Sequence, residues 1–274
     1  MTMPTRVFVV KFGGNAIRGK EDMARLSGEV AGLVRDGARV VLVHGGGPEI
    51  SAEMERRGLA PKKVAGLRVT DAEALKVAEE VLGAINREMT ACLMEASVDA
   101  VGMPAYLCTL CRRKGPHTAV EGGEEVTVDL GLVGEVAEVD AGALADLLSA
   151  GVTPVIYPIG ADPDGNRLNV NADTMAAGIA AGIGCDEMIM ITDVPGVLLD
   201  VGDPSSLVGR LTLAEADALI SQGIISGGMV PKVDACRAAL EAGAGAVRMV
   251  DGRGAGGMLA GLTGGMPHGT VITR

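Results

Sequence analysis

Short apolar runs that end in glycine-rich turns recur along the sequence and constrain its fold more than any other feature. The runs cover residues 6–12, 39–43, 153–159 and 187–191. Segments with helical spacing of apolar residues separate or flank them, at residues 21–35, 49–57, 71–96, 141–150 and 172–183. Continuous apolar strands that alternate with amphipathic helices predict a mainly parallel central sheet covered on both faces, an αβα sandwich of the α/β class.

Glycine turns follow the first two predicted strands, at Gly13-Gly14 and Gly45-Gly46-Gly47. Ligands of parallel sheets gather at the carboxyl ends of the strands, where these turns are expected. Exposed amides in a glycine turn at a helix N-terminus bind anions, and Lys11 at the end of the first strand adds a positive charge. A single glycine turn is usually structural, but two at one sheet edge favour an anion site.

Residues 105–139 interrupt the strand–helix alternation. Apolar and polar residues alternate at 125–129 and 135–139, which predicts antiparallel hairpins. A second series of strand–helix units begins near residue 181. We therefore expect two lobes, residues 1–180 and residues 181–274.

The composition argues against several classes of function. The chain has only two Phe, two Tyr and no Trp, so it lacks the aromatic faces on which nucleic-acid bases stack. A formal net charge of -11 repels nucleic-acid backbones and anionic membranes at long range. No apolar stretch reaches the roughly 18 residues that a membrane span requires. We expect a cytoplasmic protein without nucleic-acid or membrane partners.

The five cysteines do not form an obvious disulfide framework. Cys108 and Cys111 make a CxxC pair beside the basic run Arg112-Arg113-Lys114. A zinc site would need two more ligands, and only His117 is close in sequence. We interpret the pair as ordinary thiols.

Two glycine motifs imitate nucleotide-binding fingerprints. Residues 14–20 fit GxxxxGK, but Glu21 stands where a P-loop has the Ser or Thr that holds magnesium. Residues 252–257 fit GxGxxG after a predicted strand at 246–250, but the further strand and acidic residue of a dinucleotide fold are not found after them. We assign neither motif to nucleotide binding.

Two further segments carry polar groups next to predicted helix starts. Asn169-Val170-Asn171-Ala172-Asp173 can be a helix cap, although two amides and a carboxylate exceed what one cap needs. Gly227 to Lys232 places a lysine near a glycine turn, where it is either a surface residue or an anion ligand. The residues alone leave both alternatives open.

In their order along the chain, these segments resemble the amino acid kinase family. The matching stretches are VKFGG at 10–14, HGGG at 44–47, GLRVT at 66–70, NVNAD at 169–173, TDVPGV at 192–197 and GMVPK at 228–232. The ending at 265–270, GMPHGT, is also similar to that of the family. The resemblance implies the fold of this family for nearly the whole chain.

The resemblance also implies an activity, transfer of the γ-phosphoryl group of ATP to a carboxylate. The expected acceptor is the side-chain carboxylate of N-acetyl-L-glutamate, in arginine biosynthesis. Lys11 and Lys232 would contact the transferring group from opposite lobes, with Asp173 between them holding both in place. Such catalysis is mainly positioning and charge stabilisation. Mg²⁺ would be held mainly by the phosphates of ATP, with no metal site on the protein.

By the same resemblance, Arg68 would bind the α-carboxylate of the acceptor and Asn169 another part of it. The amides of Gly14, Gly45 and Gly46 would bind the phosphoryl group and the substrate. The residues expected around ATP are Gly13, Gly14, Asp193, Val194, Pro195, Gly196, Val197, Leu198, Ile224, Ile225 and Ser226. Relatives in this family lead us to expect a homodimer.

Two departures from the family concern the identity of the acceptor. Residues 103–109 read MPAYLCT where the family has a loop with Gly and Asp, and the helix from Asp71 is one residue short near Gly83. The alternatives are a kinase for a carrier-linked aminoadipate or glutamate, docked at Arg112 to Lys114, and a phosphonate kinase of the fosfomycin type. A non-catalytic member and a dinucleotide-dependent oxidoreductase are more distant alternatives.

Overall fold

The computed structural model describes residues 5–13, 19–64, 67–121, 124–253, 259 and 269–274. Its centre is an eight-stranded sheet in the order β14-β16-β15-β13-β1-β2-β10-β5. Six adjacent strands are parallel: β15 (Val247–Asp251), β13 (Glu187–Thr192), β1 (Val7–Phe12), β2 (Arg39–His44), β10 (Thr153–Tyr157) and β5 (Ala100–Pro104). Only β16 (Thr270–Thr273) and β14 (Arg210–Thr212) run the other way among the strands of this sheet. The prediction of a mainly parallel sheet is confirmed.

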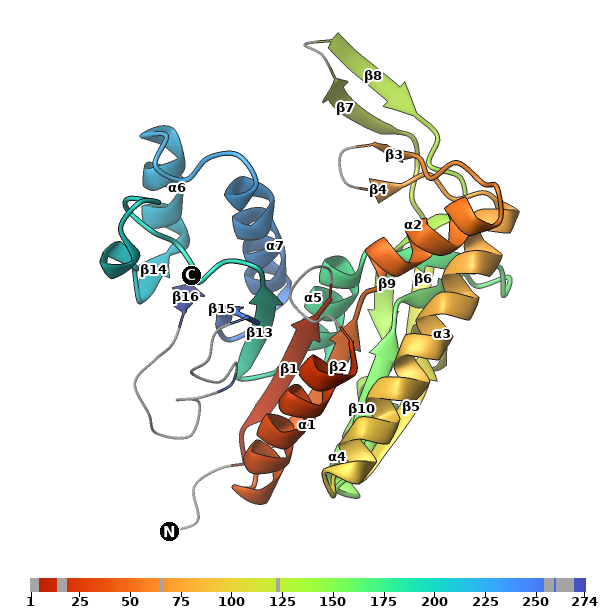
Figure 1. Cartoon of the computed structure of the whole chain (residues 1–274), viewed down its shortest axis with the longest axis horizontal. Helices are drawn as coiled ribbons and strands as arrows, with labels where there is room; N and C mark the ends of the chain where they lie inside the picture. The colour runs from red at the N-terminus through yellow and green to blue at the C-terminus, as the bar shows by residue number, and fades with distance from the viewer. Residues whose placement is uncertain (1–4, 14–18, 65–66, 122–123, 254–258, 260–268) are drawn as a thin grey trace.

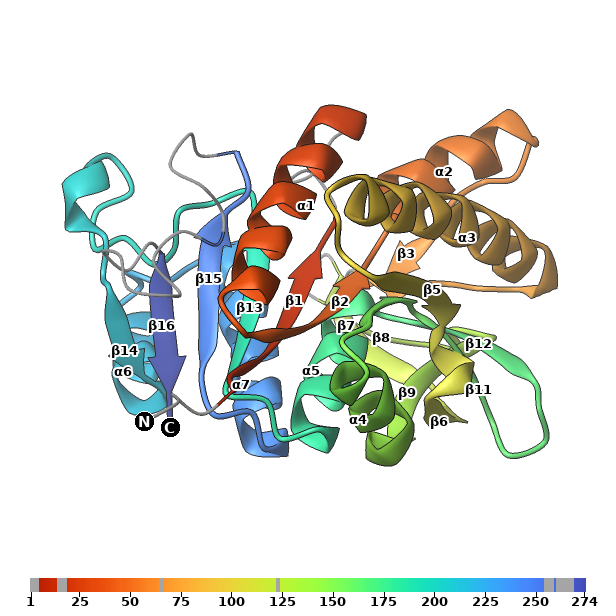
Figure 2. The ribbon, with the colours of Figure 1, turned by 90° about the horizontal axis from the view of Figure 1, so that it is seen from below.

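Helices cover both faces of this sheet. Successive side chains of β1 point to opposite sides, and buried apolar side chains lie on both. Phe8 and Val10 enter a core shared with α1 (Lys20–Arg35) and α3 (Ala72–Glu95). Val9 enters a second core, shared with α4 (Ala141–Ser149), α5 (Ala172–Gly182) and α7 (Met229–Ala242). Figures 1 and 2 show the resulting layers, and the predicted αβα sandwich is confirmed.

A second, smaller sheet lies in the region where the sequence pattern breaks. The strand predicted over 153–159 divides at Pro158, which has no N–H to donate to a sheet, into β10 and β11 (Ile159–Ala161). The small sheet has the order β11-β12-β9-β6, with β12 (Arg167–Val170), β9 (Val133–Val139) and β6 (Thr109–Arg113). β9 is antiparallel to β6, and β7 (His117–Glu121) forms a hairpin with β8 (Glu124–Val128). The antiparallel pairing predicted here is confirmed.

The remaining elements are short. They are α2 (Gly47–Arg56), the paired strands β3 (Lys63–Val64) and β4 (Leu67–Arg68), the 3₁₀ turns η1 (Ala105–Leu107) and η2 (Pro204–Ser206), and α6 (Leu213–Ser221). The missing residue near Gly83 causes no break, since α3 is continuous from Ala72 to Glu95. Among the described helices, none has both the length and the apolar character needed to cross a membrane.

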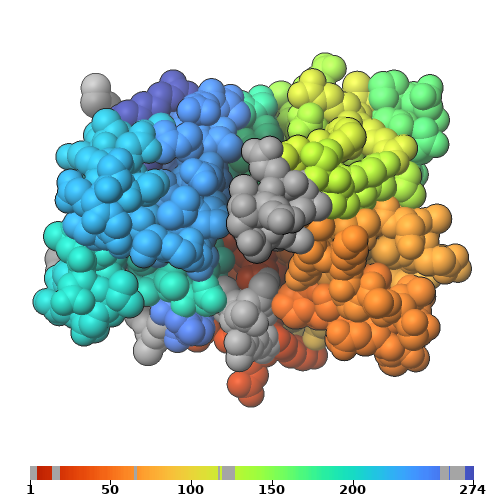
Figure 3. Space-filling model, turned by 90° about the horizontal axis from the view of Figure 1, so that it is seen from above, coloured from red at the N-terminus to blue at the C-terminus, as the bar shows by residue number. Residues whose placement is uncertain are grey.

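The turns after β1 and β2 meet at the carboxyl edge of the sheet. Lys11 is paired in register with Val43 of β2 and with Met190 of β13, so it lies near the middle of the sheet. Gly13 has a φ of 146°, and a Cβ there would lie 3.0 Å from the amide nitrogen of Gly45. Only glycine allows the two backbones to approach so closely. Figure 3 views this edge from above, with C-terminal residues in blue opposite the orange-to-green first half.

Candidate active site

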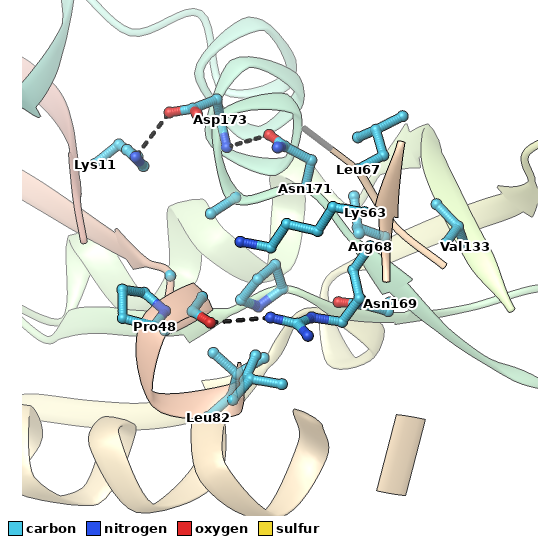
Figure 4. A pocket seen from close by; sticks show the side chains of 17 residues that line it. Lys11, Pro48, Lys63, Leu67, Arg68, Leu82, Val133, Asn169, Asn171 and Asp173 are labelled. Carbon is cyan, nitrogen blue, oxygen red and sulfur yellow. Dashed lines mark hydrogen bonds and ion pairs between the residues drawn. The ribbon is translucent and has the colours of Figure 1, made fainter. Parts of the chain in front are cut away.

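A cavity of about 350 Å³ opens at this carboxyl edge. It is lined by residues from β1, the turn before α2, the β3–β4 hairpin, β12 and the start of α5. The predicted site residues that it brings together are Lys11, Gly45, Gly46, Arg68, Asn169 and Asp173. Figure 4 shows the side chains of Lys11, Arg68, Asn169 and Asp173 around one space. Residues that lie up to 162 positions apart in sequence therefore share a single cavity.

Lys11 and Asp173 form an ion pair at one end of the cavity. Lys11 is on the same side of β1 as Val9, which faces α5, and Asp173 lies in the first turn of that helix. The Nζ atom of Lys11 is 2.8 Å from Oδ1 of Asp173. Oδ1 is buried and accepts no well-directed hydrogen bond from the described residues, so the contact is mainly electrostatic. The lysine side chain is 14% exposed, which leaves its charge only weakly screened by water.

The polar segment at 169–173 serves two purposes. Asn171 caps α5, because its side-chain oxygen accepts hydrogen bonds from the backbone amides of Asp173 at 2.8 Å and Thr174 at 3.1 Å. Asn169 and Asp173 are not needed for the cap and line the cavity instead. Asn169 donates from Nδ2 to Oγ1 of Thr70 at 3.1 Å, which ties β12 to the strand pair that carries Arg68.

Arg68 is a buried cation, with 7% of its surface exposed. Its guanidinium donates to the carbonyl of Gly47 at 2.9 Å, to Oγ of Ser51 at 2.7 Å and to Sδ of Met54 at 3.2 Å. A guanidinium has five N–H donors, so two remain without a described acceptor. No carboxylate among the described residues forms an ion pair with it, and burial lowers the pKa of Arg68. A buried charge without a partner is costly, which suits a residue that receives an anion.

The glycine turn after β2 offers the amides of Gly46 and Gly47 to the cavity, whereas the expected amide of Gly45 is already used. The Gly45 N–H donates to the carbonyl of Phe12 at 3.0 Å and is not free to bind a substrate. The N–H groups of Gly46 and Gly47 belong to the start of α2 and make no hydrogen bond with a described residue. Orphan amides at a helix N-terminus attract anions.

Lys232 reaches the same edge from α7, but its partner differs from the expected one. Its Nζ atom lies 2.6 Å from Oδ1 of Asp193, which follows β13. The expectation that Asp173 holds both lysines is therefore not met, because each lysine has its own carboxylate. α7 packs against α5, whose first turn carries Asp173, and the charge of Asp173 contributes to the raised pKa of Cys236, one turn after Lys232.

The residues expected around ATP lie beside this cavity and not in it. Asp193 to Leu198 follow β13, the neighbour of β1, and the Val197 amide donates to Oγ1 of Thr270 at 2.8 Å. Ile225 is buried, whereas Ser226 is exposed. Gly13 lines a small neighbouring cavity with Gly45. Gly14 falls outside the described residues, as do most of the GxxxxGK segment and the last four positions of the GxGxxG segment.

Lys63 is a cavity residue that our reading of the sequence missed. It lies on β3, opposite Arg68 in the strand pair, and Figure 4 shows its side chain extending into the cavity. Its only sequence signal is the Lys62-Lys63 pair ahead of the GLRVT stretch. A pair of exposed lysines is too common a feature to identify a site by itself.

Of the two features that made the acceptor uncertain, the loop at 103–109 lies away from the cavity, whereas Leu82, beside Gly83, lines it. None of the residues 103–109 is among those that line it. Arg112 is paired with Glu135 at 2.6 Å and Arg113 with Asp129 at 3.7 Å, which reduces the free positive charge for docking an acidic carrier. The thiols of Cys108 and Cys111 are buried, and burial raises the pKa of Cys108 to about 12. A thiol of that pKa stays protonated at neutral pH, as an ordinary structural cysteine does.

A parallel sheet with a cationic cavity at the carboxyl ends of its strands is the arrangement at which α/β proteins bind small anionic molecules. A model of the amino acid kinase family matches residues 6–251. The chain belongs to the amino acid kinase family, as its motifs predicted.

Several curated relatives have high identity over most of the chain. An acetylglutamate kinase from Symbiobacterium thermophilum is 42% identical over 250 residues, which cover 90% of this chain and 85% of the relative. An acetylglutamate kinase from Methanopyrus kandleri is 45% identical, with 81% of this chain and 91% of the relative covered.

Solved structures agree with the fold. An N-acetylglutamate synthase from Neisseria gonorrhoeae, complexed with coenzyme A and N-acetyl-glutamate, superposes with a TM-score of 0.82 and 25% identity over 98% of this chain. The chain spans 59% of the length of that synthase. A carbamate kinase from Giardia superposes with a TM-score of 0.72 over 99% of this chain and 100% of the kinase. Its sequence identity is 17%, so the similarity shows the fold alone.

Proposed function

We propose that this enzyme transfers the γ-phosphoryl group of ATP to the side-chain carboxylate of N-acetyl-L-glutamate, the acyl-phosphate-forming step of arginine biosynthesis. The observation that carries the proposal is the buried guanidinium of Arg68, without a carboxylate partner among the described residues, in the same cavity as Lys11. N-acetylglutamate has two carboxylates, one for each of these cations. Identity of about 40% to acetylglutamate kinases over most of the chain supports the same acceptor.

Arg68 and Asn169 are the residues that would hold the acceptor. The guanidinium donors left without a described partner are the Nε–H and one N–H of Nη1, which lie on different edges of the group, so a paired contact with the α-carboxylate would require Nη2 to release Gly47 or Ser51. Asn169 uses one amide hydrogen for Thr70 and keeps its carbonyl oxygen for the N–H of the acetamido group. The reacting carboxylate is ionised at neutral pH, so no general base is needed to activate it.

Lys11, Lys232 and the amides of Gly46 and Gly47 would stabilise the transferring phosphoryl group. Negative charge is spread over its oxygens in the transition state, and fixed donors in a partly water-excluded site stabilise that charge. Lys11 is held in place by Asp173. Lys232 would exchange Asp193 for the phosphoryl group, an exchange of one anionic partner for another.

Mg²⁺ would accompany ATP and be held mainly by its phosphates. The two carboxylates next to the proposed reaction centre, Asp173 and Asp193, are each neutralised by a lysine 2.6–2.8 Å away. A metal ion would have to displace those ammonium groups to gain a carboxylate, whereas the phosphate oxygens of ATP are good ligands for it.

We assign acceptor binding to the lobe of residues 1–180 and nucleotide binding to the lobe of residues 181–274. In support of this division, all residues that line the cavity precede residue 180. Asp193 follows β13, which pairs with β1, and Lys232 forms an ion pair with it, so both would act from the second lobe on a group bound beside the first. The adenine and ribose would lie on Asp193 to Leu198 and Ile224 to Ser226.

A homodimer and a cytoplasmic location complete the proposal. β5 is an edge strand of the large sheet, and Val101 on it is 36% exposed. An edge strand with exposed apolar residues is a ready template for pairing with a second copy. Sedimentation equilibrium of the wild type and of Val101→Lys tests the dimer, which the lysine should weaken. The cytoplasm is where ATP is abundant and where unpaired cysteines stay reduced.

The acceptor is tested by trapping acyl phosphates with hydroxylamine in the presence of ATP and Mg²⁺. We expect turnover with N-acetyl-L-glutamate and none with L-glutamate or fosfomycin. The Asp173→Asn variant is the control for contaminating kinases, because it removes the charge that holds Lys11 and should abolish most of the turnover. Fosfomycin phosphorylation, measured by ³¹P NMR, would instead show a phosphonate kinase, and inactivity with every acid would refute the proposal.

A further inference from the structure

A buried histidine stands directly behind the glycine turn of the cavity. His44 is the last residue of β2 and has no exposed surface. Its Nδ1 atom is 2.9 Å from the carbonyl oxygen of Gly45, and its Nε2 atom is 3.1 Å from Nδ2 of Asn86 on α3. The histidine thus connects the turn to helix α3.

The surroundings of Asn86 determine which ring nitrogen of His44 carries the proton. Nδ2 of Asn86 also lies 2.9 Å from the carbonyl oxygen of Val155, which can only accept a hydrogen bond, so the amino group must face it. That amino group then donates its second hydrogen to Nε2 of His44. Because Nε2 accepts, the proton of the neutral ring lies on Nδ1 and is donated to Gly45. Burial lowers the pKa of His44 to about 4, so the ring is neutral at physiological pH.

Tight packing holds this arrangement in place. The His44 ring stacks on Phe12, with 5.7 Å between ring centroids, and lies 6.4 Å from the ring of Tyr157. Asn86 is 3% exposed and lies against Gly102 of β5, where a Cβ would be only 2.2 Å from Oδ1 of Asn86. The asparagine therefore has little freedom to turn its amide away from the histidine.

The carbonyl held by His44 determines the direction of a neighbouring amide. In a trans peptide the C=O of Gly45 and the N–H of Gly46 point in opposite directions, and the described chain has no cis peptide. A Gly45 carbonyl directed at the buried ring therefore directs the Gly46 N–H away from it. Gly46 lines the cavity, and the Gly45 N–H is already bonded to Phe12. Of the two free donors of the turn, the N–H of Gly46 is consequently oriented by His44.

We propose that His44 is a positioning residue for phosphoryl transfer: its Nδ1–H holds the Gly45 carbonyl so that the Gly46 amide faces the transferring group, and Asn86 selects the tautomer that does this. The inference rests on the proposed function for its kinetic consequence. His44 does not touch the substrate, so it acts through the backbone of Gly45 alone.

Kinetics of three variants test the role. His44→Leu removes the donor and should lower kcat about 100-fold, the size of effect seen when one oriented transition-state donor is lost. The KM values for ATP and acceptor should change less than about threefold, since ground-state contacts remain. His44→Asn keeps an N–H near the position of Nδ1 and should retain kcat within about fivefold. Asn86→Leu should lower kcat about tenfold, because the proton of the His44 ring would then no longer be confined to Nδ1.

A matched variant separates positioning from loss of stability. Val30→Ala shortens a fully buried side chain on α1, away from the cavity, and should lower the melting temperature with kcat unchanged. Equal losses of kcat in Val30→Ala and His44→Leu would mean that any destabilised core impairs turnover, which overturns the role. A kcat of His44→Leu within threefold of the wild type overturns it too.

The ¹⁵N NMR shifts of the His44 ring give a readout that needs no turnover. The expected result is a protonated Nδ1 and an unprotonated Nε2 in the wild type, with a mixed population in Asn86→Leu. A protonated Nε2 in the wild type would refute the inference. A wild type with the expected tautomer but no turnover of N-acetylglutamate would refute the proposed function, while the histidine geometry stands.

Discussion

The ammonium group of Lys232 lies 2.6 Å from the carboxylate of Asp193, while Lys11 holds Asp173 at 2.8 Å. Two cations that would repel each other at one reaction centre are thus kept in place by separate acids. The hydrogen bond from Lys232 is the largest cause of the lowered pKa of Asp193. Both side chains are more than a quarter exposed, so the pair contributes on the order of 1 kcal/mol or less and exchanges readily for a stronger anion.

Replacement of Lys232 should therefore affect chemistry more than folding. We expect Lys232→Met to lower kcat at least about 100-fold with a change in KM for ATP below about fivefold, because its contact strengthens in the transition state. Arg237→Gln is the matched control, a cation on the same helix whose partner is the surface residue Asp217. Steady-state kinetics of both variants check this, and a rise in KM alone for Lys232→Met would contradict the assigned role.

Arg68 should be important for binding the acceptor and of little benefit to stability. Arg68→Met should raise the KM for the acceptor at least about 30-fold, since a charge-assisted pair with a carboxylate is lost. The free energy of unfolding should change by less than about 1 kcal/mol, because the lost hydrogen bonds are offset by removing a buried charge. Kinetics and urea unfolding measure the two effects, with the exposed Arg56→Met on α2 as control. An unchanged acceptor KM would exclude Arg68 from the site.

The buried His44 should make stability depend on pH. Its pKa is about 4 in the folded chain against 6.5 in the unfolded chain, so the unfolded state binds a proton first as the pH falls. Stability from this group is complete above pH 6.5 and is lost as the pH falls towards 4, by about 3 kcal/mol in total. The free energy of unfolding, measured with urea, should fall between pH 7 and pH 4.5 in both proteins. The fall should be about 2–3 kcal/mol smaller in His44→Asn than in the wild type. Equal drops would contradict a neutral buried ring.

At the amino ends of the strands, Glu187 of β13 forms ion pairs with Arg248 of β15 and with Arg6, the residue before β1. Its two oxygens lie 3.1 Å from Nη2 of Arg6 and 2.5 Å from Nε of Arg248, and the residue is 4% exposed. Glu187→Gln should destabilise the chain by about 3 kcal/mol, because removing one charge of a buried group weakens the whole arrangement. The kcat of the folded fraction should not change. Asp217→Asn, the same type of change in an exposed pair, should cost less than about 1 kcal/mol and serves as the control in thermal unfolding.

Most elements of the central fold could be predicted from local pattern. The strand predicted at 6–12 is Val7–Phe12, and the helix predicted at 172–183 is Ala172–Gly182. The meeting of Lys11 with Asp173 could also be anticipated, because a strand end and a helix start at one edge of a parallel sheet are close together. The division at Pro158 was not anticipated, although proline cannot donate to a sheet.

Partners that depend on the rotation of packed helices could not be predicted. Asn86 lies 42 residues after His44, inside a long helix where nothing local distinguishes it from other polar residues. Lys232 pairs with Asp193 and not Asp173 because of where the first turn of α7 comes to lie. Lys63 enters the cavity only because β3 pairs with β4 beside Arg68.

Periodicity and glycine turns are local properties, so the αβα architecture, the sheet edge that carries the cavity and most of the charged groups there can be deduced from the order of residues. The packed fold is needed to show which carboxylate each lysine holds, which amides are free and which tautomer the buried histidine adopts. Those outcomes depend on distances of a few ångströms between elements far apart in the chain, and side-chain packing alone sets such distances.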